Sequence, residues 1–200
     1  MKVITLSREY GAGGHSIGRK VAAELGIEFY DKDIFRETVK ASGFDPDTIN
    51  SEEEEISTAD SILKTICNAS SFFFSDTQNA IHEVQQAVIQ HFAEMGPCVI
   101  LGRCADDTLA KAGIDSFDVF IHADVIHRAQ RVGEILGTQD INEIRKAISK
   151  KDTSRRNYYN HYTGKHWGDA RNYDMCLNSG ALGYDTCARM IVDAVKSLED

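Results

Sequence analysis

The sequence contains no apolar run long enough to span a membrane, and no repeat, low-complexity tract or interdomain linker. Its N-terminus lacks the basic segment, apolar core and cleavage site of a signal peptide, because Met1–Leu6 enters a strand pattern at once. The 5 cysteines are odd in number and show no CxxC spacing, which favours buried free thiols over a metal site. We therefore expect a cytoplasmic protein with no membrane partner.

Excess positive charge is also absent, since 22 Lys and Arg stand against 31 Asp and Glu and give a net charge of -9. Binding to a polyphosphate backbone needs a broad basic face, so we expect no nucleic-acid partner. A small basic pocket for a nucleotide is compatible with this charge. The hydrophobic fraction of 42% and the charged fraction of 26% predict a single globular domain over residues 1–200. Whether the chain forms a homo-oligomer is left open.

Short apolar runs alternate with helical patterns along the chain. The predicted strands are Val3–Leu6, Ile27–Tyr30, Cys98–Leu101, Phe117–His122 and Tyr173–Leu177. The predicted helices cover Ile17–Leu25, most of Ser61–Met95, Val125–Leu136, Ile141–Thr153 and Tyr184–Leu198. This alternation predicts an α/β fold with a parallel sheet and right-handed crossovers. Such sheets bind ligands beyond the carboxyl ends of their strands, so the loops that follow the first four strands are the expected site.

A glycine-rich loop, Ser7–Ser16, lies between the first strand and the first helix. Its core residues are Gly11, Ala12, Gly13, Gly14, His15 and Ser16. Glycines let successive backbone N–H groups turn toward phosphate oxygens, and the following helix adds the positive end of its dipole. The alternative is a strand-to-helix turn whose glycines serve geometry only. The loop predicts phosphate binding, with the Ser16 hydroxyl placed to ligate Mg²⁺.

The loop departs from a standard P-loop in its charge. With Ser16 in the place of the hydroxyl residue, Gly14 falls where the lysine should be and Arg8 where the first glycine should be. The lysine normally neutralises the charge of the β- and γ-phosphates. Arg8, Arg19, Lys20 or a more distant arginine are the candidates to replace it, and the sequence does not choose among them.

Several segments, in chain order, resemble the cytidylate-kinase-like family. The matching segments are Ile4–Phe35, Ile100–Asp106 with its strand and Gly-Arg pair, Phe120–Arg131, Lys150–Arg156 and Tyr173–Ser179. The resemblance covers nearly the whole chain and is nearest to a divergent branch with a Tyr158–Asp169 segment. It implies a P-loop NTPase three-layer sandwich with a five-stranded parallel sheet, of the nucleoside monophosphate kinase type. A helical acceptor-binding lobe over about residues 31–95 and a lid segment over about residues 150–172 are also implied.

The same resemblance assigns expected roles and implies ATP and Mg²⁺ as cofactors with a nucleotide as the small-molecule substrate. The donor nucleotide would be held by Arg8, Gly11, Ala12, Gly13, Gly14, His15, Ser16, Arg128 and Arg131. The acceptor would be held by Asp31, Arg36, Arg103 and Asp106. The residues expected to assist transfer are Arg103, Lys151, Arg155 and Arg156.

Independent residue chemistry supports part of this assignment. Arg103 follows a glycine at the end of a predicted strand, where a guanidinium fork suits the oxygens of a phosphate. Arg155 and Arg156 form a basic cluster in an acidic chain, although a solvated basic helix end is the alternative. Arg128 and Arg131 share a helical face by their spacing and are either nucleotide ligands or a plain surface pair.

Three functions are therefore compatible with the sequence. The first is ATP-dependent phosphoryl transfer to a nucleoside monophosphate, CMP or dCMP by resemblance. The second is a nucleotide-sensing module without kinase activity, which Gly14 favours, as does Leu101 where cytidylate kinases carry an aspartate. The third is a kinase for another phosphorylated or hydroxylated metabolite.

Overall fold

A computed structural model describes residues 2–31 and 77–198 of the chain. Most of the predicted acceptor-binding lobe, including Arg36, lies outside the described residues, as does Cys67. Of the helices expected there, α4 is described and spans Thr77–Met95. It ends before Gly96, where the Gly-Pro pair is predicted to stop it.

Five strands form one parallel sheet, as predicted. They are β1 (Val3–Arg8), β2 (Glu28–Tyr30), β3 (Cys98–Leu101), β4 (Ser116–His122) and β5 (Met175–Asn178). Their order across the sheet is β2-β3-β1-β4-β5, and every neighbouring pair is parallel. The central strand β1 is longer than expected because its register with β4 continues to the pair Arg8 and Ile121. Arg8 is therefore the last residue of the central strand.

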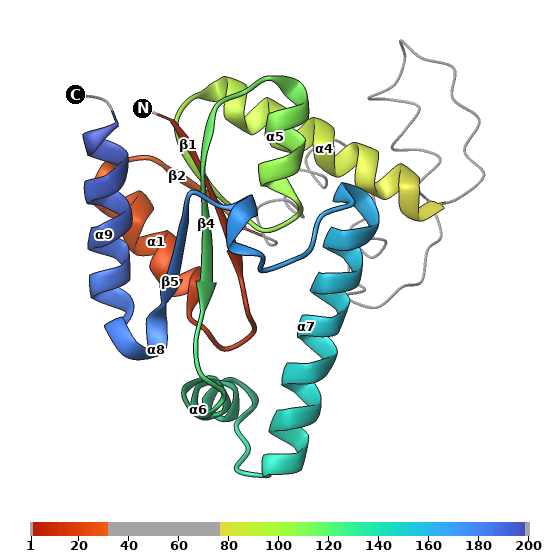
Figure 1. Cartoon of the computed structure of the whole chain (residues 1–200), viewed down its shortest axis with the longest axis vertical. Coiled ribbons are helices and arrows are strands. Elements are labelled where there is room, and N and C mark those ends of the chain that lie inside the picture. Colours follow the sequence, from red (N-terminus) through yellow and green to blue (C-terminus); the bar gives the residue numbers. More distant parts are fainter. Residues whose placement is uncertain (1, 32–76, 199–200) are drawn as a thin grey trace.

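Helices cover both faces of the sheet and make three layers (Figure 1). On one face, α1 (Gly14–Leu25) and α9 (Tyr184–Ser197) bury their apolar sides against β1 and β4. On the other face, α4 and α5 (Ala105–Ala112) pack against β2 and β3. Burial of these apolar side chains is the main favourable term in the folding of the two halves.

Two further helices lie at the carboxyl end of the sheet. Helix α6 (Val125–Leu136) follows β4, and the long α7 (Ile141–Thr163) packs on it through Val132, Ile144 and Ile148. The sequence predicts that this second helix ends at Thr153, and that prediction is wrong. The helix continues because the buried Tyr159 anchors it to α5, while Tyr158 and Tyr162 contact His82 of α4. Because this part of the helix makes contacts on several of its sides, its sequence does not show a single apolar stripe at helical spacing.

Short elements complete the chain: η2 (Ala170–Asn172) and α8 (Ser179–Leu182). Among the described cysteines, Cys98, Cys104 and Cys187 are buried free thiols, as expected, whereas Cys176 on the edge strand β5 is exposed. No helix in the described ranges is long and apolar enough to cross a membrane.

Candidate active site

The loop between β1 and α1 needs glycine at two positions for both conformation and space. Gly11 and Gly13 have φ angles of 85° and 76°, a region that side chains rarely adopt. A Cβ on Gly11 would lie 2.7 Å from the carbonyl oxygen of Arg128, and one on Gly13 would lie 2.3 Å from the Tyr184 ring. No side chain caps the N-terminus of α1, and its first turn holds no acidic residue. The helix thus begins with backbone donors directed toward the loop.

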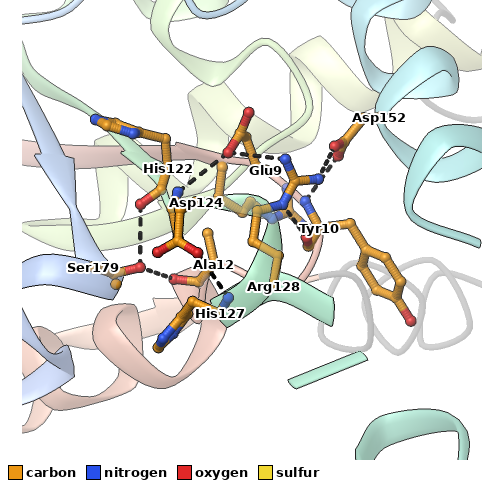
Figure 2. A network of polar contacts seen from close by, with 12 residues as sticks. Glu9, Tyr10, Ala12, His122, Asp124, His127, Arg128, Asp152 and Ser179 are labelled. Atoms are coloured by element: carbon orange, nitrogen blue, oxygen red, sulfur yellow. Dashed lines mark hydrogen bonds and ion pairs between the residues drawn. The ribbon is translucent and has the colours of Figure 1, made fainter. Parts of the chain in front are cut away.

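An ion-pair network holds the beginning of this loop against α6 and α7 (Figure 2). The buried Arg128 donates from Nε to the Tyr10 carbonyl oxygen at 2.8 Å and pairs with Glu9 at 3.1 Å. It also pairs with Asp152 of α7, which accepts a hydrogen bond from the Tyr10 backbone N–H at 2.8 Å. We name this set, Glu9, Tyr10, Arg128 and Asp152, the loop clamp. Its contacts fix both the backbone and the charge at the entrance to the loop.

The second half of the loop is tied to the carboxyl ends of β4 and β5. The fully buried Ser179 hydroxyl lies 2.7 Å from the carbonyl oxygen of Ala12 and 3.2 Å from that of His122 (Figure 2). Asp124 caps α6 by accepting hydrogen bonds from the backbone of Ile126 and His127. Both ends of the glycine loop are therefore held by tertiary contacts.

Arg8 and Arg155 meet directly over this loop. Arg155 donates from Nη1 to the Arg8 carbonyl oxygen at 3.1 Å, and its guanidinium lies 5.7 Å from the centre of the Tyr10 ring. Burial lowers the pKa of Arg8 well below its ordinary value, and the charges of Arg155 and Arg103 lower it further, whereas Asp31 acts in the opposite direction. The charges of Arg155 and Arg103 thus both act on Arg8 at the carboxyl edge of the sheet, an arrangement that a bound anion stabilises.

The turn after β3 places Arg103 beside them. Gly102, Arg103 and Cys104 have consecutive φ angles of 79°, 65° and 56°. A left-handed backbone costs energy at the two non-glycine residues, and such strain is concentrated at functional sites. The Gly102 N–H is held by the Leu6 carbonyl at 2.9 Å, which ties the turn to the central strand. The consecutive left-handed residues form the kind of backbone concavity that binds anions.

Asp31 and His15 lie across the site, after β2 and at the start of α1. Their Oδ2 and Nε2 atoms are 2.8 Å apart, and the His15 side chain is half exposed. Ser16 follows on the same turn of α1; its side chain is partly exposed, and no hydrogen bond from its hydroxyl is found within the described ranges. The predicted Mg²⁺ ligand is thus sterically accessible.

The other two residues expected to assist transfer, Lys151 and Arg156, also lie on α7. Arg156 is exposed, and its guanidinium lies 5.9 Å from the centre of the Trp167 ring. Trp167 itself donates to the Ser7 hydroxyl at 3.1 Å and packs edge-on against Phe120. Lys151 is partly buried on the same helix. The tryptophan packs this segment onto the end of the sheet.

Three predicted ligands are placed in other surroundings. Arg128 belongs to the loop clamp, where the protein itself engages its guanidinium on three sides. Arg131 is partly exposed and pairs with Glu134 at 2.8 Å, so the two arginines do not act as one pair. Asp106 is buried against the sheet, where it accepts a hydrogen bond from Tyr159 at 2.6 Å. Burial raises its pKa to about 6.

No local sequence pattern marks Glu9, Tyr10 or Ser179 as residues that hold the site. Glu9 and Arg128 are separated in the sequence by three of the five strands, and no local pattern marks the pair. Ser179 acts through its hydroxyl on a carbonyl of the distant Ala12. Their roles become visible only from tertiary contacts.

A parallel sheet in this order, with a glycine loop after the central strand and arginines around its carboxyl edge, is the architecture of P-loop kinases. Solved structures of that class share the fold over nearly the whole chain. Shikimate kinase from Bacteroides thetaiotaomicron has 15% identity, covers 98% of each chain and gives a TM-score of 0.55. Shikimate kinase from Acinetobacter baumannii in complex with shikimate has 15% identity, covers 98% of this chain and 94% of its own, and gives a TM-score of 0.52.

The chain belongs to the cytidylate kinase-like family, whose model matches residues 3–181. It is also similar to an uncharacterized protein from Eubacterium ventriosum ATCC 27560, with 27% identity and a TM-score of 0.74 over 98% of this chain and 99% of that one. A search of the curated proteins gives no match. The family and the fold place the protein among kinase-like nucleotide-binding proteins and confirm the predicted fold class.

Proposed function

We propose that the protein transfers the terminal phosphoryl group of ATP to a nucleoside monophosphate, with CMP or dCMP as the first acceptors to test. The observation that carries the proposal is the meeting of Arg8, Arg103 and Arg155 beside a glycine loop at the carboxyl edge of a parallel sheet. Positioning and positive charge provide most of the catalysis in this reaction. The membership of the chain in the cytidylate kinase-like family supports the acceptor class.

The reaction breaks the bond between the γ-phosphorus and the oxygen that bridges it to the β-phosphorus. A new bond forms between that phosphorus and an oxygen of the acceptor phosphate, and ADP leaves with the bridging oxygen. Glycine-loop N–H groups of Gly11–Ser16 would hold the donor phosphates, and Arg103 would hold the acceptor phosphate. Arg155, with Lys151 and Arg156 on the same helix, would stabilise the charge that develops between them.

Mg²⁺ fits this arrangement as a nucleotide-bound cation. The described ranges hold no group of three or more His, Cys, Asp or Glu residues that could bind a metal by themselves. Mg²⁺ in kinases takes few protein ligands and relies on substrate phosphates and water, and the accessible Ser16 hydroxyl would be one protein contact. When bound, the ion neutralises phosphate charge during transfer.

The test is a coupled assay for ADP release with ATP, Mg²⁺ and a panel of CMP, dCMP, UMP and AMP. We expect turnover with at least one acceptor, and a large loss of kcat in an Arg155→Ala variant. The variant Arg171→Ala is the matched control, because Arg171 is exposed and, among the described residues, forms its ion pair with Asp169, two positions earlier. Folded protein that binds ATP without turning over any acceptor would instead identify a nucleotide-sensing module.

A hydroxylated small molecule is the second candidate acceptor, and the contact between His15 and Asp31 favours it. An ionised phosphate needs no base to accept a phosphoryl group, whereas a hydroxyl must lose its proton during transfer. A carboxylate and an imidazole 2.8 Å apart beside the glycine loop can take that proton. Turnover of hydroxylated metabolites but not of nucleotides in the same assay, with loss of activity in Asp31→Asn, would select this candidate.

A further inference from the structure

We propose that Arg8 supplies the positive charge on the donor phosphates that a lysine supplies in standard loops of this type. The proposal rests on the proposed nucleotide binding and adds the residue that performs it. The sequence leaves this cation unidentified, because glycine stands at position 14. Two glycines on separate loops give the space that the Arg8 side chain occupies.

The first of these is Gly14, the residue in the lysine position. A Cβ placed there would lie 2.7 Å from both Cβ and Cγ of Arg8. Carbon atoms at that distance overlap, and the first part of a side chain cannot swing away from its own backbone. Arg8 and a side chain at position 14 therefore exclude one another. The arginine at the end of β1 occupies the room from which a lysine at position 14 would start.

The second is Gly102, in the turn after β3. A Cβ there would lie 2.2 Å from Nη1 of Arg8, so the guanidinium lies directly against this glycine. Arg8 thus extends from the end of β1, past the glycine loop, to the turn that carries Arg103. Over the whole residue, Arg8 is partly buried. Burial is the main cause that lowers its pKa, the like charges of Arg155 and Arg103 lower it further, and phosphate oxygens would relieve that repulsion.

The other cations near the loop are less suited to this task. Arg19 is exposed on α1, and Lys20 pairs with Asp185 of α9. Arg128 is buried in the loop clamp, with its guanidinium bound by Glu9 and Asp152. Arg8 is the cation whose side chain crosses the lysine position itself.

Because a side chain at position 8 excludes one at position 14, moving the basic residue from position 8 to position 14 tests the proposal. Arg8→Gly removes the cation and opens the space above position 14. Gly14→Lys alone places a lysine against Arg8, and Arg8→Ala with Gly14→Lys leaves the clashing Cβ of residue 8 in place. Only the double variant Arg8→Gly, Gly14→Lys places a lysine in the standard position and also leaves space for its side chain. Arg189→Ala, on the exposed side of α9, is the control for loss of an arginine elsewhere.

The measurement is calorimetric binding of ATP and AMP to the full chain, with circular dichroism to verify folding. We expect Arg8→Gly to raise the Kd for ATP by about 10- to 100-fold, as for a lost charged hydrogen bond, and to change the Kd for AMP less. The Arg8→Gly, Gly14→Lys exchange should recover most of the ATP affinity, whereas the Arg8→Ala, Gly14→Lys pair should not.

Three outcomes would overturn the proposal in different ways. If the wild-type chain binds neither nucleotide, the proposed nucleotide function itself fails. If the wild-type chain binds ATP and folded Arg8→Gly binds it equally well, Arg8 does not have the assigned role. An exchange variant that folds but remains as weak as Arg8→Gly would also count against it.

Discussion

At the scale of single residues, Gly102 is the position where one methyl group should act on nucleotide binding. Gly102 and Gly113 have similar φ angles of 79° and 71°, so alanine is strained at both. The space around them differs. A Cβ at Gly102 would lie 2.2 Å from Arg8 Nη1, whereas no atom of the described residues lies within 4 Å of a Cβ at Gly113. A comparison of alanine variants at the two positions therefore separates the effect of backbone strain from the effect of displacing the Arg8 guanidinium.

We predict that Gly102→Ala weakens ATP binding about tenfold, since it displaces a charged group from the phosphates. Gly113→Ala should bind ATP as the wild type does. Both variants should lose a similar amount of stability, about 1–2 kcal/mol, because the backbone strain is shared. Calorimetric titration and urea unfolding of both variants check this. Equal ATP affinities in the two variants would show that Arg8 does not depend on the space at Gly102.

The sequence predicts the phosphate loop but not which cation serves it, for a physical reason. Glycine spacing is a local signal of backbone conformation, so Gly11 and Gly13 could be predicted. The position of Arg8 depends on how far β1 pairs with β4 and on the distance to Gly102, which lies on another loop. Arg128 and Arg131 share a helical face by spacing, yet only the first meets Asp152 of α7. For these arginines, contacts between segments that are distant in the sequence determine the role of each side chain.

At the scale of elements, α7 is anchored along its length to parts of the site. Asp152 joins it to the glycine loop and to α6 through the loop clamp, and Arg155 binds the carbonyl of Arg8. Further along, Tyr159 contacts Asp106 of α5. The helix therefore sets the distance between the donor loop and the basic residues expected to act in transfer. We expect the loop clamp to stabilise this arrangement.

We predict that Asp152→Asn destabilises the protein by about 2–4 kcal/mol, because it leaves the buried Arg128 with one fewer anionic partner. Arg128→Met should cost a similar amount, and the double variant should cost clearly less than the sum. Urea unfolding of the four proteins measures this coupling. The exposed pair of Arg131 and Glu134 is the matched control, and its coupling should stay below about 1 kcal/mol. Additive effects of Asp152→Asn and Arg128→Met would contradict the clamp.

At the scale of the whole molecule, the sheet has one apolar and one partly polar face. Alternate residues Ile4 and Leu6 of β1 enter the apolar core with α1 and α9. On the other face, Thr5 donates to Asp118 of β4 at 2.6 Å, and Ser7 accepts from Trp167. The apolar runs predict the strands correctly. A polar residue inside such a run does not reveal which distant side chains it contacts. The charges that act on Asp118 were not predictable, because Asp174 and Lys165 come from distant segments.

This polar face should make stability depend on pH through Asp106. Burial, with the nearby charge of Asp118, raises the pKa of Asp106 to about 6, so the folded protein holds this proton where the unfolded chain has lost it. Its contribution to stability therefore decreases as pH rises from about 4 to about 6 and is constant above that range. We predict that Asp106→Asn, which cannot ionise, matches the wild type near pH 4 and exceeds its stability by up to about 3 kcal/mol at pH 7. Urea unfolding of both proteins across this range measures the difference. Parallel pH profiles would show that the contacts of Asp106 with Tyr159 and the charge of Lys165 offset the cost of burying the carboxylate.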